Sequence, residues 1–129
     1  MKGFDEMDKL EKIFYMQNMF DTDLVKNRGL ENITMPEWIQ KETLAMLSEL
    51  SELIDEVNFK WWKNPKEVNV TRVKEELVDI LHFFTAMCLK TGMSADELFE
   101  MYMQKNKENF DRQYGKSAKA GYELKQSDD

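Results

Sequence analysis

The chain has 129 residues and a net charge of −7, with 42% hydrophobic and 33% charged residues. This is one domain's length with enough apolar side chains for a core, and the negative charge argues against binding to nucleic acid or anionic membranes. No apolar run reaches the ~20 residues of a membrane span, the N-terminus lacks the apolar stretch of a signal peptide, and the single cysteine excludes an internal disulfide. We therefore expect a soluble cytoplasmic protein.

Apolar periodicity and helix-end signals predict an all-α protein. The four predicted helices span about residues 5–26, 36–57, 71–90 and 95–113. Gly29 can end the first helix in the left-handed conformation, and Thr34 is a candidate N-cap for the second. Ser94 and Glu97 form a capping box at the start of the fourth. We expect a four-helix bundle in residues 1–114 and a polar tail at 115–129.

The third predicted helix is unusually apolar. From Leu77 to Leu89, only Asp79 and His82 interrupt the apolar side chains strongly. A helix that is apolar nearly all round is buried nearly all round, and one bundle of this size would struggle to cover it. The sequence therefore predicts a partner subunit, in the form of a homodimer.

Two acidic pairs are the best indication of chemistry. Glu49 and Glu52 lie three residues apart in the second predicted helix, as do Glu76 and Asp79 in the third. Such pairs share one helix face, so antiparallel packing would bring four repelling carboxylates together. A hard divalent cation would relieve that repulsion, and carboxylate oxygens select Mg²⁺, with Mn²⁺ as the alternative, over zinc. Either pair alone could also be ordinary surface charge.

Two further groups of residues could bind a ligand. Residues 105–125 hold six basic against three acidic side chains, which could form a phosphate clamp or an ordinary cationic helix end. Trp61 and Trp62 follow the first acidic helix and could stack on a planar base or belong to the core or an interface. His82, the single histidine, lies one turn after Asp79 and is either a core residue or a binding residue.

Together these segments resemble the all-α dimeric dUTPases, a branch of the MazG-like nucleoside triphosphate pyrophosphohydrolases. The acidic pairs, separated by 23 residues, resemble the ExxE and ExxD motifs of that superfamily. The segments that resemble the dUTPase branch are FKWWKN at 59–64, ELVDILHF at 76–83, KNKENFDRQ at 105–113 and the Met16-Gln17 region of the first helix.

The resemblance implies a MazG-like four-helix dimer that cleaves dUTP to dUMP and diphosphate with Mg²⁺, keeping the nucleotide pool free of dUTP. It makes Glu49, Glu52, Glu76 and Asp79 the metal ligands, with Glu49 or Glu52 also activating water. The implied phosphate-binding residues are Lys63, Lys105, Arg112 and Lys116. The implied nucleoside-binding residues are Gln17, Asp21, Trp61, His82, Phe83 and Asn109. At the position of Asp21, four residues after Gln17, the family tends to carry asparagine.

Two alternatives remain. A pyrophosphohydrolase of another nucleotide, such as dCTP or a modified nucleotide, would share the metal site and differ around Gln17, Asp21, Trp61 and Asn109. A helical interaction protein without catalysis would instead use the apolar third helix and the ten methionines as a docking surface.

Overall fold

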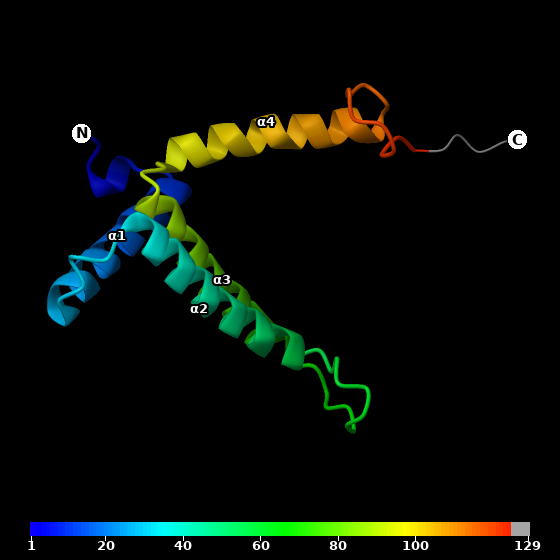
Figure 1. Ribbon diagram of the computed structural model, residues 1–129, viewed down its shortest axis with the longest axis horizontal. Helices are drawn as coiled ribbons and strands as arrows, with labels where there is room; N and C mark the ends of the chain where they lie inside the picture. Colours follow the sequence, from blue (N-terminus) through cyan, green and yellow to red (C-terminus); the bar gives the residue numbers. More distant parts are fainter. Residues whose placement is uncertain (125–129) are drawn as a thin grey trace, which may run out of the picture. The chain divides into compact units, whose positions relative to one another are not determined.

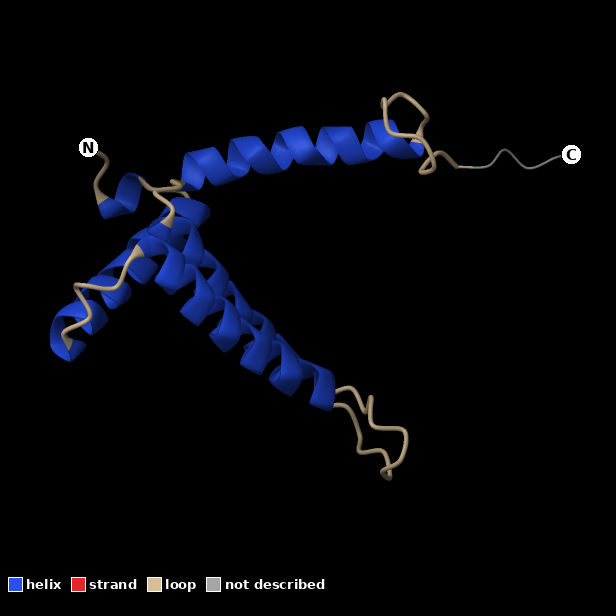
Figure 2. Ribbon diagram, in the orientation of Figure 1, coloured by secondary structure: helices blue, strands red, loops and turns tan. Residues whose placement is uncertain are grey.

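A computed structural model describes residues 1–124 of the chain. A short 3₁₀ helix at Phe4–Glu6 is followed by four long helices, namely α1 (Lys9–Arg28), α2 (Met35–Asp55), α3 (Val70–Lys90) and α4 (Ala95–Gln113) (Figure 1). Within these 124 residues there is no strand (Figure 2), which confirms the predicted all-α class. Across the same range, each helix is too short or too polar to traverse a lipid bilayer.

Local capping explains where the helices begin and end. α1 begins later than predicted, because Asp8 and Glu11 form a capping box in which Asp8 Oδ1 accepts from the Glu11 backbone N–H at 2.8 Å. Gly29 ends α1 in the left-handed conformation at φ 63°, and Thr34 Oγ1 accepts from the Glu37 backbone N–H at 3.4 Å. Both of these predicted caps are confirmed.

The chain divides into two compact units, Met1–Ser94 and Ala95–Asp129. The first unit contains α1, α2 and α3, and the second contains α4 and the segment after it. The predicted division after residue 114 stays a prediction. Residues 125–129 of the predicted tail, including Lys125, lie outside the described residues.

In the first unit, α2 and α3 run antiparallel side by side, and α1 contacts α3 near the end at which α2 begins (Figure 1). The buried side chains of this unit are few: Phe14, Gln17, Asp21, Thr85, Ala86 and Cys88. Cys88 is a free thiol, and burial raises its pKa. This small core lies where α1 meets α3, so it fixes the angle at which α1 approaches the α2–α3 pair.

Much of the apolar surface of α2 and α3 remains exposed. Leu44 and Leu47 on α2 are 67% and 55% exposed, and Leu77 and Val78 on α3 are 51% and 52% exposed. In one chain α3 is therefore only partly buried, and its predicted cover by a partner subunit stays a prediction. Within the first unit, α1 and α2 cover only part of the circumference of α3.

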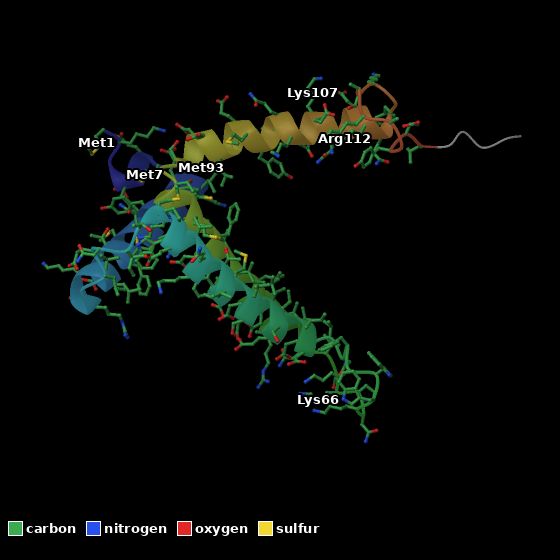
Figure 3. The ribbon with its side chains drawn as sticks, in the orientation of Figure 1. Met1, Met7, Lys66, Met93, Lys107 and Arg112 are labelled. Atoms are coloured by element: carbon green, nitrogen blue, oxygen red, sulfur yellow. The ribbon has the colours of Figure 1, made fainter. Side chains whose placement is uncertain are left out.

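The loop between α2 and α3 is closed by one asparagine. Asn58 has a positive φ of 60°, its Nδ2 donates to the Lys66 carbonyl at 2.7 Å, and its Oδ1 accepts from the Lys66 N–H at 2.9 Å. Lys66 lies in this loop, at the tip of the α2–α3 pair (Figure 3). Between these two residues the Trp61 and Trp62 rings meet edge to face with centroids 4.6 Å apart.

We predict that Asn58→Ala loosens this loop. The substitution removes both hydrogen bonds and places a residue without a polar side chain in the left-handed conformation. Hydrogen exchange should show a loss of protection at the Lys66 amide of about tenfold or more. Asn64→Ala, in the same loop, is the control and should leave that amide unchanged; equal exchange in both variants would contradict the assigned role of Asn58.

Candidate functional site

Three of the four predicted metal ligands come together between α2 and α3. Glu49, Glu76 and Asp79 each offer a carboxylate oxygen, and the three oxygens lie within 4.8 Å of one another. Glu49 belongs to α2 and the other two to α3, one turn apart. The antiparallel helix pair thus builds the cluster from residues that are distant in sequence. We call Glu49, Glu76 and Asp79 the carboxylate cluster.

The cluster is electrostatically strained in the protein alone. The pKa of Glu76 rises from its ordinary 4.5 to about 7, because the group is desolvated by its surroundings, hydrogen-bonds Glu49 and feels the negative charges of Glu52 and Glu49. Glu49 Oε2 and Glu76 Oε2 are also shielded from water and have no hydrogen-bond partner among the described residues. Burying carboxylate oxygens without hydrogen-bond partners costs free energy. The cluster therefore favours the binding of a proton or a cation.

The geometry of the cluster is compatible with a divalent cation. Two oxygens on opposite sides of a Mg²⁺ ion lie about 4.2 Å apart, since each bond is about 2.1 Å long. That separation matches oxygens that lie within 4.8 Å of one another. A donor set of carboxylates alone suits Mg²⁺ or Mn²⁺. The metal roles of these residues stay predictions.

Glu52 occupies a different position. It is exposed on α2 and is not one of the three residues of the cluster, although its charge raises the pKa of Glu76. A side-chain hydrogen bond to Glu52 also contributes to the raised pKa of Glu76, so Glu52 reaches α3. The fourth predicted ligand therefore lies beside the cluster in the protein alone.

A cavity of about 740 Å³ adjoins the cluster in the first unit. Glu49 and Asp79 form part of its wall, and most of the remaining wall is apolar, with Met16, Phe20 and Phe83 among its side chains. Its volume is within the range of small-molecule sites, about 300–1,000 Å³. The cavity thus combines an acidic side with apolar walls that suit a flat organic ring.

A hydrogen-bonded chain crosses from α1 to α3 in the cavity wall. Gln17 Nε2 donates to Asp21 Oδ1 at 2.9 Å, and Gln17 Oε1 lies 2.8 Å from His82 Nδ1. Burial raises the pKa of Asp21, against the effects of the Gln17 hydrogen bond and the nearby positive charges of Lys90 and His82. Four of the six predicted nucleoside-binding residues, namely Gln17, Asp21, His82 and Phe83, therefore line one cavity.

Other predicted residues lie away from this cavity. Trp61 is 85% exposed in the α2–α3 loop and does not line the cavity. Lys63 belongs to the same loop and lines a smaller hollow of about 140 Å³. Neither residue is brought to the carboxylate cluster by the first unit alone.

The second unit holds the remaining predicted residues. Arg112 Nε donates to Glu108 Oε1 at 3.2 Å, and its guanidinium lies 5.3 Å from the centre of the Tyr122 ring. Lys107 Nζ pairs with Asp111 Oδ2 at 2.8 Å; Figure 3 marks Lys107 and Arg112 on α4. The other predicted ligand-binding residues of this unit are Lys105, Asn109 and Lys116. Arg112 is thus held in place by its own unit.

Two polar residues of the cavity wall, Glu42 and Thr85, were not in the predicted site. Glu42 lines the cavity, and its pKa is raised by burial and by the charge of Asp21. Its position seven residues before Glu49, on the same helix face, was the available signal. Thr85 is 1% exposed and also lines the cavity, but nothing in its sequence context separates it from an ordinary core residue.

The fold and site define an all-helical protein with a carboxylate cluster beside an apolar cavity. A profile of the family described as dUTPase matches residues 9–94, which include α1 to α3 and both acidic pairs. The chain therefore belongs to the all-α dUTPase family, as its sequence motifs predicted.

Two relatives from bacteriophages carry a more specific name. A dCTP pyrophosphatase of Enterobacteria phage T4 is 37% identical over 87 residues, covering 57% of this chain and 51% of that protein. A dCTP pyrophosphatase of Enterobacteria phage LZ5 is 35% identical over 74 residues, covering 57% of this chain and 43% of that protein. The chain thus spans about half the length of these relatives. No solved structure gives a significant match.

We predict that the stability of the metal-free protein depends on Glu76. Because its folded pKa of about 7 exceeds its ordinary 4.5, its contribution is full below about pH 4.5 and is lost as pH rises through about 7. Glu76→Gln should remove that part of the decline in the free energy of unfolding, measured by urea denaturation with a chelator at several pH values. The control Glu75→Gln, at an exposed neighbour, should keep the wild-type slope. Identical slopes in the two variants would refute the coupling.

Proposed function

We propose that the protein is a Mg²⁺-dependent pyrophosphohydrolase of a pyrimidine deoxynucleoside triphosphate in the cytoplasmic nucleotide pool. The observation that carries this proposal is the carboxylate cluster, whose oxygens lie within 4.8 Å of one another beside a cavity of about 740 Å³. The cluster offers oxygen ligands to a cation, and the cavity offers apolar walls to a base. Membership of the dUTPase family supports the same activity.

In the proposed reaction, a water oxygen bonds to the α-phosphorus while the bond from that phosphorus to the bridging oxygen of the β-phosphate breaks. The products are the nucleoside monophosphate and diphosphate. Glu49, Glu76 and Asp79 would hold Mg²⁺, which would supply positive charge to the phosphate oxygens and make the attacking water more acidic. Glu49 and Glu76 orient the reacting groups, and Glu49 or the neighbouring Glu52 accepts the proton of the attacking water.

We propose that four basic side chains bind the phosphate groups: Lys63, Lys105, Arg112 and Lys116. Negative charge accumulates on the leaving diphosphate as the bond breaks, and cationic side chains stabilise it there. Arg112 suits this role because its planar guanidinium can donate two hydrogen bonds to one phosphate. Its contacts with Glu108 and Tyr122 hold the guanidinium in one orientation.

The base is either uracil or cytosine in this proposal. The family description, dUTPase, favours dUTP, the substrate first expected from the sequence motifs. The names of the two phage relatives favour dCTP. We propose that Gln17, Asp21, His82 and Phe83 surround the base in the cavity, with Trp61 and Asn109 also contacting the nucleoside.

We further propose that the protein acts as a homodimer. The exposed apolar side chains of α2 and α3, such as Leu44 at 67% and Val78 at 52%, form a surface that water solvates poorly. A second copy of the chain would cover such surfaces symmetrically. A dimer would also complete the burial that the apolar sequence of α3 predicts.

We predict that Glu49→Gln and Asp79→Asn each lower Mg²⁺-dependent diphosphate release from dUTP or dCTP by at least about 100-fold. Each substitution removes one cation ligand while nearly preserving shape. The control Glu75→Gln should retain wild-type turnover, and circular dichroism should show the same helix content in all variants.

Wild-type protein that releases no diphosphate from any deoxynucleoside triphosphate with Mg²⁺ would contradict the proposed enzyme and favour the helical interaction protein. Binding of Mg²⁺ by Glu49→Gln and Asp79→Asn as tight as that of the wild type, measured by calorimetry, would contradict the metal-ligand roles of these two residues.

For the dimer, light scattering during size exclusion should give about twice the chain mass of 15.4 kDa. Replacing exposed Leu44 by Glu should shift the protein toward the monomer, because a charge would then be buried in the interface. Replacing Glu75 by Lys is the control for an added change of surface charge. A wild-type protein that elutes as a monomer at all concentrations would contradict the dimer.

A further inference from the structure

We propose that Asp21 makes the site prefer a pyrimidine with an amino group at ring position 4, as in cytosine, over one with a carbonyl oxygen there, as in uracil. This inference rests on the proposed function, because it chooses between the two substrates that the proposal leaves open. It is carried by the hydrogen-bonded chain of Asp21, Gln17 and His82.

The first observation is an unpartnered oxygen in the cavity wall. Asp21 lines the cavity and is 8% exposed, and its Oδ1 accepts from Gln17 Nε2 at 2.9 Å. Its other oxygen, Oδ2, has no hydrogen-bond partner among the described residues, and no cationic side chain there lies within ion-pairing distance of Asp21. Buried polar atoms are rarely left without a partner, so this oxygen points to a donor that a ligand supplies.

The second observation is the donor-to-acceptor direction of the hydrogen bonds that link Asp21, Gln17 and His82. An ionised carboxylate only accepts hydrogen bonds, so the amide nitrogen of Gln17 must face Asp21 and its oxygen must face His82. His82 Nδ1, 2.8 Å from that oxygen, then carries the proton. In the neutral imidazole this leaves Nε2 as an acceptor. With the imidazole neutral, both ends of this hydrogen-bonded chain offer acceptors and no donor.

An acceptor-only surface discriminates between the two bases. The 4-amino group of cytosine donates hydrogen bonds and can satisfy Asp21 Oδ2. The 4-carbonyl oxygen of uracil accepts hydrogen bonds and cannot donate one. Placed against Asp21, it would leave both Asp21 Oδ2 and itself without a donor. A site built around a polar group rejects a ligand that cannot pair with it far better than an apolar pocket rejects a small change in size.

An asparagine at position 21 would not discriminate in this way. Its amide can turn to present either its oxygen or its nitrogen, and together with the amide of Gln17 it could then reverse the direction of the whole chain. The reversed chain would offer a donor to the 4-carbonyl oxygen of uracil. The difference between one oxygen and one nitrogen at this position thus decides which base is favoured.

The experiment measures kcat/KM for dCTP and for dUTP, with Mg²⁺, in the wild type and in Asp21→Asn. We expect the wild type to prefer dCTP by about tenfold or more and Asp21→Asn to lower the dCTP-to-dUTP ratio by about 10- to 100-fold. The ratio is independent of how much of each preparation is folded. The control is Asp23→Asn, the same chemical change at an exposed residue of α1 that bonds Asn27, and its ratio should equal that of the wild type.

Wild-type protein that prefers dUTP, or an Asp21→Asn variant with an unchanged ratio, would overturn this inference and leave the proposed hydrolysis intact. Absence of turnover of every nucleotide would overturn the proposed function instead. Calorimetry with dCMP and dUMP then tests the inference alone: tighter binding of dCMP by the wild type, lost in Asp21→Asn, supports it, and equal binding of the two nucleotides overturns it.

Discussion

The mutual repulsion of Glu49, Glu76 and Asp79 is the constraint on which the site depends. The antiparallel pairing of α2 and α3 holds their oxygens within 4.8 Å of one another, and two of those residues have an oxygen shielded from water without a partner among the described residues. Packing and capping along both helices must supply the free energy that this crowding costs. A cation would convert the repulsion into attraction. A region that opposes folding in the protein alone would therefore stabilise the complex with metal.

A second constraint joins α1 to this pair. The bond between Gln17 and His82 spans the two helices, and the small core around Phe14 and Thr85 lies at the same contact. The cavity consequently has one wall on α1 and others on α2 and α3, so its shape follows from how α1 approaches. The carboxylate cluster and the hydrogen-bonded chain both border this cavity. The cluster presents negative charge to a cation, and the chain presents hydrogen-bond acceptors to a ring.

Local signals in the sequence predicted the helices well because helix ends are decided locally. Gly29 and Thr34 act as predicted, whereas the capping box of Asp8 and Glu11 makes α1 begin at Lys9, later than the predicted residue 5. Three of the four predicted cation ligands come together, since spacing of three residues fixes a face. Glu52 lies beside them, where its charge still raises the pKa of Glu76. The cavity role of Glu42, the burial of Thr85 and the exposure of α3 depend on contacts between distant segments, which periodicity does not contain.

The clamp between Asn58 and Lys66 has an evolutionary consequence. Within the α2–α3 loop it closes residues 58–66 through the Asn58 side chain and the backbone N–H and carbonyl of Lys66. The segment from 59 to 65, with its adjacent tryptophans, can therefore acquire substitutions while the helices on either side keep their register. Substitutions in this loop therefore need not disturb the carboxylate cluster. Related proteins could change what the loop contacts while α2 and α3 keep the cluster in place.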